Sequence, residues 1–259
     1  MTHEDLLLEN VLEEHEDIVF IRPHAQFPVF RDGTNWDWAS TPDAASLMPE
    51  MNRFIELIGR TCYKSEDRIT DTSAGRFLKM LVSSGHESVI EHLTLTVKFV
   101  GSRAMSHQLV RHRLAAFSQE SQRYVNYGKG EKMFAVMPPG IFRAGGKVKE
   151  DFVRGINDAC KQYIELLSGG VKPEDARSLL PNAVKTEVVM STNLRQWRHV
   201  VEERGMNSRA QWEIRTICLQ VLEAFNCLLP EVFGDLWVMR NNKIDVLTAD
   251  TKYDLGGAV

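Results

Sequence analysis

Apolar and polar positions follow two different periods along this chain, and together they predict both helices and strands. Apolar residues recur with helical spacing in the segments 51–58, 77–82, 102–115, 150–167, 193–204 and 208–229. Short β-branched or alternating runs occur in the segments 17–21, 93–99, 133–138 and 184–190. The clearest strand is 93–99, and its strict alternation predicts a half-buried antiparallel strand whose polar face, Thr94 included, points outward.

Residues typical of helix ends bound several of these segments. Gly85 and the pair at 169–170 predict helix C-termini, because glycine adopts the left-handed conformation at low cost. Asn193 and Ser208 are each followed three residues later by glutamine, which predicts helix N-caps, and Pro230 predicts the end of the last helix. Strands and helices do not alternate regularly. We therefore expect an α+β fold in which helices pack on a mainly antiparallel sheet.

No internal repeat and no linker-like stretch interrupts the chain, which predicts a single domain over residues 1–259. Residues 1–15 are rich in charge, and we expect them to form a helical leader. A turn signal and two tryptophans within 27–42 indicate a loop or hairpin insertion. The tail, 241–259, has no clear periodicity.

The composition is that of a globular protein, with 43% hydrophobic and 25% charged residues among 259. The net charge of -4 argues against a protein that coats nucleic acid through a positive surface. The acidic N-terminus lacks the features of a signal peptide, and no stretch approaches the ~18 apolar residues of a membrane span. We therefore expect a cytoplasmic protein that binds neither membrane nor nucleic acid. The four cysteines lack metal-binding spacing and are expected to be reduced thiols.

Three partial motifs do not meet the requirements of their chemistry. Residues 145–147 (GGK) resemble a phosphate loop, but no serine or threonine follows them. Residues 128–130 (GKG) start like a dinucleotide fingerprint, but Met133 stands at the third glycine position. His86 and His92 lie six residues apart and would point about 120° apart on one helix. We therefore expect neither a Rossmann unit nor a metal site.

Basic residues gather in the segment 103–124, which holds four arginines and one acidic residue. Such a run usually forms a solvated helical face. Here, however, the arginines lie among apolar residues, and a planar guanidinium suits phosphate and uracil oxygens. On a helix Arg111 and Arg113 would point about 200° apart, so either the helix ends here or two ligands are bound. Gln108, Arg111 and His112 would share one helical face.

The same segment resembles the signature of a known enzyme family. The residues Arg111, His112 and Arg113 are followed after seven residues by Ser121, which is similar to the R-H-R-x7-S signature of flavin-dependent thymidylate synthases. Further stretches resemble family motifs in the family's order, and these are 85–92 (GHESVIEH), 176–181 (ARSLLP), 193–199 (NLRQWRH) and Arg204 with 210–213 (AQWE). The resemblance covers roughly residues 50–240 and leaves the leader, the 27–42 insertion and the tail unmatched.

This resemblance implies an enzyme that converts dUMP to dTMP. Members of the family take the carbon from 5,10-methylenetetrahydrofolate and the hydride from FAD that NADPH reduces, and they are homotetramers with shared active sites. A covalent enzyme nucleophile is not expected, because no cysteine stands in the Pro-Cys-His context of the other class of thymidylate synthase. Two alternatives stay open. One is a flavoprotein of this fold acting on another uracil nucleotide, and the other is a single-strand RNA-binding protein.

The resemblance also implies roles for individual residues. Arg204 is similar to the arginine that favours ionisation of the uracil at N3, since a fixed cation stabilises the anion and makes C5 more nucleophilic. His92 resembles a histidine near the flavin ring and the folate. The residues implied to hold FAD are Thr94, Arg111, His112, Arg113, Gln119, Asn193, Leu194, Arg195 and His199. The residues implied to bind dUMP are Gln108, Leu109, Val110, Arg111, Gln119, Glu120, Ser121, Gln122, Arg123, Arg177 and Arg204.

The chain departs from the commonest family pattern near these residues. Ala116 and Gln119 stand where many relatives have serine and glutamate, and Arg209 stands where many have histidine. The change at Gln119 removes a negative charge near an anionic ligand, which favours binding of that ligand.

Overall fold

The larger of two sheets is built around two long antiparallel strands, in a computed structural model that describes residues 3–15, 17–31, 35–129 and 132–241. β5 (Thr94–Ser102) and β8 (Lys185–Asn193) pair along their whole length. β3 (His24–Arg31) pairs with β5 and with β4 (Asn35–Ala39), while β6 (Ala116–Gln119) lies on the other side of β8. The strand order is therefore β4-β3-β5-β8-β6, and every neighbouring pair is antiparallel.

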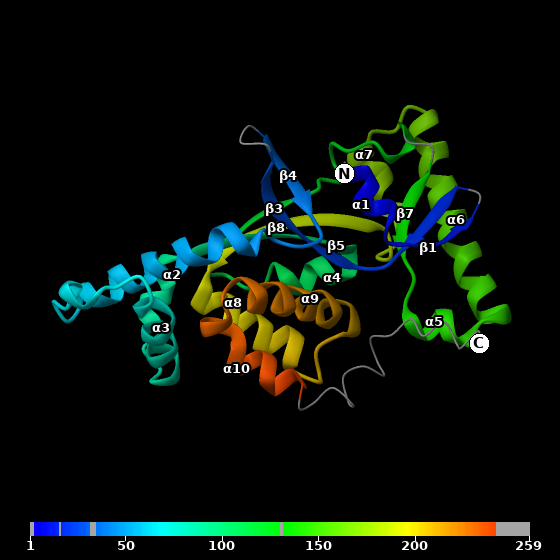
Figure 1. The fold of residues 1–259 in the computed structure, drawn as a ribbon. Helices are drawn as coiled ribbons and strands as arrows, with labels where there is room; N and C mark the ends of the chain where they lie inside the picture. Colours follow the sequence, from blue (N-terminus) through cyan, green and yellow to red (C-terminus); the bar gives the residue numbers. More distant parts are fainter. Residues whose placement is uncertain (1–2, 16, 32–34, 130–131, 242–259) are drawn as a thin grey trace.

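A smaller sheet lies at one end of the molecule (Figure 1). It contains β1 (Val11–His15), β2 (Ile18–Ile21) and β7 (Met133–Val136) in that order, and β2–β7 is the one parallel pair among the described strands. The amphipathic helix α6 (Gly146–Ser168) packs against it, as the apolar spacing at 150–167 predicts. Their common core includes Ile18, Phe20, Met133, Cys160 and Tyr163.

Three helices from the C-terminal part of the chain lie together beneath the larger sheet (Figure 1). These are α8 (Leu194–Val200), α9 (Trp212–Leu228) and α10 (Pro230–Asn241). Trp197 of α8 is fully buried, where it stacks on Phe99 of β5 at 6.2 Å between ring centroids. Burial of several large aromatic and aliphatic side chains, each contributing about 1.5–3 kcal/mol, fixes α8 against the sheet.

Two further helices extend away from the sheets at the opposite end (Figure 1). α2 (Ala44–Thr61) and α3 (Ser73–Ser83) both have amphipathic sequences, and each confirms the helix predicted from apolar spacing. Gly85 follows α3 with φ of +71°, the left-handed conformation that its predicted role at a helix end requires.

Short elements connect these layers. The remaining helices are α1 (His3–Leu8), α4 (Arg103–Leu109), α5 (Pro139–Ala144) and α7 (Pro173–Ala176). The 3-10 turns are η1 (Glu66–Arg68), η2 (Glu87–His92), η3 (Tyr127–Lys129) and η4 (Arg177–Leu179), and η5 (Val201–Met206) is a π-helical turn.

The segment 27–42 forms a hairpin, which is one of the two structures predicted for it. The strand that leads into this hairpin pairs with β5, with Ala25 opposite Phe99. The polar face of β5 is also less open than predicted. Thr94 is exposed, but Lys98 is only 4% exposed because Trp38 of β4 covers it.

Other predictions of helix ends and extents need correction. The leader contains α1 but continues into β1, because the apolar residues after α1 pair with β2. Gln211, rather than Ser208, caps α9, and its side chain accepts hydrogen bonds from the backbone of Glu213 and Ile214. Pro230 begins α10 instead of only ending α9, since the first turn of a helix tolerates proline. Residues 242–259 of the predicted tail lie outside the described residues.

The predicted class, a mixture of helices with a mainly antiparallel sheet, is confirmed. Among the helices of the described residues, none is long and apolar enough to cross a membrane.

Candidate active site

The arginine-rich segment leaves its helix earlier than the apolar spacing predicts. The Ser102 hydroxyl caps α4 by accepting a hydrogen bond from the Met105 amide, and the helix ends at Leu109. The chain then turns into β6, which begins at Ala116 and pairs with β8, so the helix does not continue to residue 115. The first of the two alternatives is therefore correct, since Arg111 and Arg113 lie in a turn. The prediction that Gln108 shares a helical face with Arg111 was wrong.

His112 occupies the centre of this turn and points inward. It is 7% exposed, whereas its neighbours Arg111 and Arg113 are exposed. Arg204 donates a hydrogen bond from Nε to His112 Nε2 at 3.0 Å. Because a guanidinium can only donate, His112 Nε2 must be the unprotonated nitrogen. The imidazole therefore serves as the acceptor that fixes the guanidinium.

The surroundings of His112 keep it neutral. Burial first of all, together with the positive charges of Arg204 and His199, lowers the pKa of His112 to about 4. The rings of His112 and His199 lie edge to face, with 5.9 Å between their centroids. Arg204, His112 and His199 thus form one cluster, which we call the Arg204 cluster.

Arg204 lies on an unusual piece of helix. α8 continues directly into the π-helical turn η5, in which one extra residue widens the turn. Gly205 follows Arg204, and a Cβ atom added to Gly205 would lie 3.4 Å from the Cβ atom of Cys218. The close packing of η5 on α9 therefore holds the backbone of Arg204 in a fixed place.

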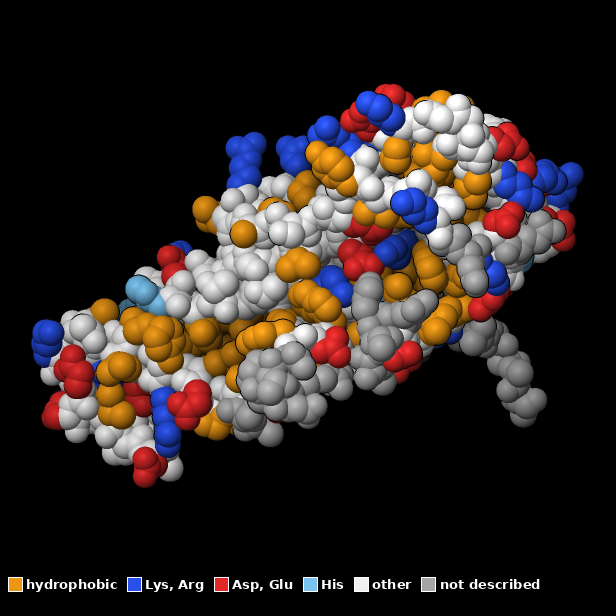
Figure 2. Space-filling view, turned by 90° about the horizontal axis from the view of Figure 1, so that it is seen from above, with side chains coloured by type: hydrophobic (Ala, Val, Ile, Leu, Met, Phe, Trp, Pro, Cys, Tyr) orange, Lys and Arg blue, Asp and Glu red, His pale blue; other side chains and the backbone are white. Residues whose placement is uncertain are grey.

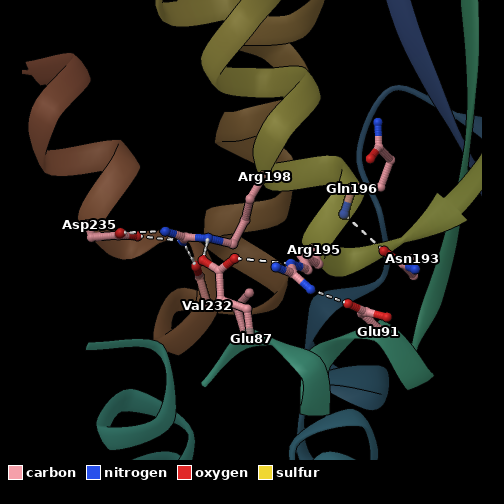
Figure 3. A network of polar contacts seen from close by, with 8 residues as sticks. All are labelled: Glu87, Glu91, Asn193, Arg195, Gln196, Arg198, Val232 and Asp235. Carbon is pink, nitrogen blue, oxygen red and sulfur yellow. Dashed lines mark hydrogen bonds and ion pairs between the residues drawn. The ribbon is translucent and has the colours of Figure 1, made fainter. Parts of the chain in front are cut away.

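The segment from Asn193 to His199 lines a cavity of about 720 Å³. The Asn193 side chain accepts a hydrogen bond from the Gln196 amide at 2.9 Å, which confirms the predicted N-cap of α8 (Figure 3). Asn193, Arg195 and His199 all contribute to the wall of the cavity, whereas Leu194 is fully buried in the core. Leu194 can therefore offer a ligand only its backbone.

Charged residues that the sequence analysis did not select support the same wall (Figure 3). Arg198 is 7% exposed and makes two hydrogen bonds of 2.7 Å to the carboxylate of Asp235. Glu87 lies 3.3 Å from Arg198 and 3.5 Å from Arg195, and Glu91 lies 2.5 Å from Arg195. The motif at 193–199 contains Arg198, but only the folded chain shows that its partner lies on α10.

The residues at 119–122 are anchored to β8. Gln119 donates hydrogen bonds from Nε2 to the hydroxyls of Ser106 and Thr186, at 2.9 and 3.3 Å. The Glu120 carboxylate lies 3.3 Å from Lys185, and Gln122 is buried. The Ser106 hydroxyl already donates to the Arg103 carbonyl, so it needs a donor such as the Gln119 amide, and this gives the Gln119 departure from the family pattern a structural role.

Arg123 and Arg177 are brought together from distant parts of the chain. Arg123 lies 3.5 Å from the Glu174 carboxylate, and Arg177 donates to the Glu174 carbonyl at 3.2 Å. Ser121, two residues before Arg123, accepts a hydrogen bond from its amide at 3.3 Å. Arg123 and Arg177 thus both contact Glu174 of α7, and we call these three residues the second cluster.

The remaining predicted residues fall into two groups. Thr94 pairs with Asn193 across β5 and β8, which places it beside the cavity, and His92 is exposed two residues earlier. Leu109 is buried in the core, so it can contribute only backbone atoms, while Val110 is partly exposed. In the described part of the chain, no group of three or more His, Cys, Asp or Glu residues could hold a metal ion.

Comparison with known proteins places this arrangement in a family. A family model described as "Thymidylate synthase complementing protein" matches residues 45–231. A flavin-dependent thymidylate synthase from Geobacter sulfurreducens is 37% identical over 195 residues, which cover 72% of this chain and 82% of the relative. The chain belongs to the flavin-dependent thymidylate synthase family. Another member, from Nitratidesulfovibrio vulgaris, is 42% identical over 168 residues, with 62% of this chain and 67% of the relative covered.

A solved structure supports the fold. A UMP/dUMP methylase from Streptomyces cacaoi, bound with 5-Br dUMP, aligns with a TM-score of 0.59 and 24% identity, covering 71% of this chain and 88% of the methylase chain. Both the family match and the structural likeness therefore agree with the resemblance found in the sequence. This chain is a member of a family of thymidylate-forming methyltransferases that depend on a flavin.

Proposed function

We propose that this flavin-dependent thymidylate synthase family member converts dUMP to dTMP, with 5,10-methylenetetrahydrofolate as carbon donor and FAD reduced by NADPH as hydride source. The observation that carries the proposal is the Arg204 cluster, in which a neutral histidine holds a guanidinium at 3.0 Å. His199 of this cluster also lines the cavity of about 720 Å³. The Arg204 cluster therefore adjoins, through His199, a space large enough for a ring system.

The residues around the cavity fit a flavin. Arg111 and Arg113 are exposed, and neither forms an ion pair with another described residue, which suits them to a diphosphate. Asn193, Arg195 and His199 line the cavity with hydrogen-bonding side chains. FAD, when bound and reduced, supplies the hydride that completes the methyl group. These residues, together with Thr94, Gln119 and Leu194, would hold and orient it.

Arg204 acts on the pyrimidine ring. Its described hydrogen bond engages Nε, which leaves the terminal nitrogens to face a ligand. A guanidinium beside N3 and O4 stabilises the anion that forms when N3 loses its proton, and the negative charge spreads to C5. Arg204 thus raises the nucleophilicity of C5, the atom that receives the carbon, without a covalent bond between enzyme and substrate.

The two buried cysteines, Cys160 and Cys218, support a mechanism without an enzyme nucleophile. Burial raises the pKa of Cys160 to about 11 and that of Cys218 to about 12. Cys218 packs beside Gly205 and is therefore near Arg204, yet it stays a thiol at neutral pH. Attack on C6 would require the thiolate.

The second cluster suits the phosphate of dUMP. Arg123 contacts the Glu174 carboxylate, and Arg177 contacts the backbone carbonyl of the same residue. A phosphate with charge near −2 would accept hydrogen bonds from both, and the Ser121 hydroxyl lies two residues from Arg123. Gln108, Val110, Glu120 and Gln122 would complete the nucleotide site, with Leu109 contributing backbone. His92 would lie near the flavin ring and the folate.

A homotetramer with shared active sites is part of the proposal. Hydrophobic side chains lie together over the extended end of the molecule, where α2 and α3 are found (Figure 2). The exposed apolar residues of these two helices include Leu47, Phe54, Leu57 and Met80. Apolar surface of this kind favours association between protein chains.

Three measurements on the purified full-length chain test the proposal. The protein should be yellow or take up added FAD, it should oxidise NADPH faster when dUMP is present, and it should form dTMP when methylenetetrahydrofolate is added. Chromatographic analysis with dUMP and UMP in parallel identifies the substrate. A colourless protein that takes up no FAD, or one that methylates only a different uracil nucleotide, would overturn the assignment.

A further inference from the structure

The β3–β4 hairpin covers a buried lysine in the middle of the large sheet. The Nζ atom of Lys98 lies 4.5 Å from the centroid of the Trp38 ring, and Lys98 is 4% exposed. A cation over an indole ring is stabilised by the ring's electron density, and more strongly when water is excluded. Trp38 therefore closes the sheet over a charge that is costly to bury.

Lys98 is the first of four charges that alternate in sign from β5 across β8 to the residue that follows β6. Its Nζ atom lies 3.8 Å from the carboxylate of Glu187, which lies 2.5 Å from Nζ of Lys185. Lys185 in turn lies 3.3 Å from the carboxylate of Glu120. All four side chains are largely buried, so each charge depends on its neighbours for stabilisation. We call this series the charge ladder.

The far end of the charge ladder is the segment that carries the predicted nucleotide contacts. Glu120 follows β6, and its amide donates a hydrogen bond to the Glu187 carbonyl at 2.9 Å. The backbone and the side chain of Glu120 are thus both tied to β8. Ser121 and Arg123, which face the proposed phosphate site, come directly after this double anchor.

We propose that Trp38 and Lys98 are positioning residues for nucleotide binding, acting through the charge ladder on the segment 119–123. The inference rests on the proposed function, because it takes this segment as part of the dUMP site. When Lys98 is uncharged, Glu187 has Lys185 as its remaining partner in the charge ladder. Lys185 is then drawn toward Glu187 and its attraction to Glu120 weakens, so the Glu120 side chain loses its hold on β8 while the backbone hydrogen bond and the Gln119 contacts remain.

Steady-state kinetics of dTMP formation on the flavin-loaded full-length enzyme test this positioning. Lys98→Met keeps the length of the side chain and removes the charge, and we expect the KM for dUMP to rise about tenfold while kcat changes less than twofold. Flavin content and the rate of NADPH oxidation without dUMP should stay unchanged. Trp38→Leu should raise the KM in the same direction, whereas Trp36→Leu on the same strand, at a residue that is 72% exposed, should not.

A double variant separates positioning from general damage to the sheet. Lys98→Met combined with Glu187→Gln removes one charge of each sign, and Lys185 then has Glu120 as its remaining partner in the charge ladder. The KM for dUMP should therefore return to within about threefold of the wild-type value. If Lys98→Met shows no cooperative unfolding transition, Trp38→Leu carries the same test because it retains all four charges. A wild-type KM for the folded Lys98 variant or for Trp38→Leu, or a double variant no better than the single one, overturns the inference. An inactive wild-type enzyme would instead refute the proposed function.

Discussion

Replacing His112 by leucine tests whether a neutral imidazole holds the catalytic guanidinium. The change places an apolar side chain of similar size at a position that is 7% exposed, and it removes the nitrogen that accepts the hydrogen bond from Arg204 Nε at 3.0 Å. Arg204 should then sample other rotamers and present its terminal nitrogens to the substrate less often. We expect a stable protein with a disordered guanidinium.

The size of the effect follows from the type of hydrogen bond that is lost. A hydrogen bond with one charged partner contributes about 1.5–3 kcal/mol. If the full contribution is expressed in the transition state, kcat/KM for dTMP formation should fall about 10- to 150-fold. The loss should appear mainly in kcat if Arg204, as proposed, stabilises a charge that develops after substrate binds.

The assay measures initial rates of dTMP formation at saturating FAD, with flavin content determined by absorbance. His112→Gln is the matched control, because the glutamine carbonyl oxygen can accept the same hydrogen bond, and its rate should stay within about fivefold of wild type. Full activity of the leucine variant would refute the assigned role of His112. Equal loss in the glutamine and leucine variants at equal flavin content would refute it too.

Two further predictions concern stability. As pH falls from 6.5 toward about 4, His112 binds a proton in the unfolded chain but not in the folded one, so the free energy of unfolding should decrease over this range. The decrease should be smaller in His112→Leu. Urea unfolding at several pH values checks this, and the same dependence of the unfolding free energy on pH in both proteins would contradict it. Glu213 is 2% exposed and accepts hydrogen bonds from the Ser102 amide and hydroxyl at 2.5 and 2.6 Å. Glu213→Ala should therefore lower the free energy of unfolding by about 2–3 kcal/mol. Glu223 is exposed on the same helix, and Glu223→Ala should change it little. A loss below about 0.5 kcal/mol at Glu213 would show that these hydrogen bonds do not support the start of α4.

Local signals in the sequence predict much of the fold. The strands at 93–99 and 184–190 are rich in β-branched residues and pair with each other. The Asn193 cap depends on a side chain and an amide three residues apart, so it too can be read from the sequence. Helices α2, α3 and α6 have strong apolar stripes that match their burial. In each case the deciding interaction is local, or the pattern repeats over several turns.

Long-range contacts decide the features that the sequence does not reveal. Apolar spacing continues past Leu109, but pairing of β6 with a strand about seventy residues further along ends the helix there. The π-helical turn at Arg204 differs from an α-helix by one residue per turn, which a short segment cannot show. Motif order places Arg204 and His112 in one family pattern, but the hydrogen bond between them spans 92 residues and requires the fold.

The central claim is that Arg204 stabilises the N3 anion of the bound uracil. The most direct measurement is the pH dependence of the ultraviolet absorbance, or of the nitrogen-15 signal of N3, for dUMP bound to the flavin-loaded enzyme and to its Arg204→Ala variant. The account predicts that bound dUMP loses its N3 proton at a lower pH than free dUMP in the wild-type enzyme, and at the pH of free dUMP in the variant, which should form no dTMP. The same N3 titration in both proteins, or dTMP formation by the variant at the wild-type rate, would contradict it.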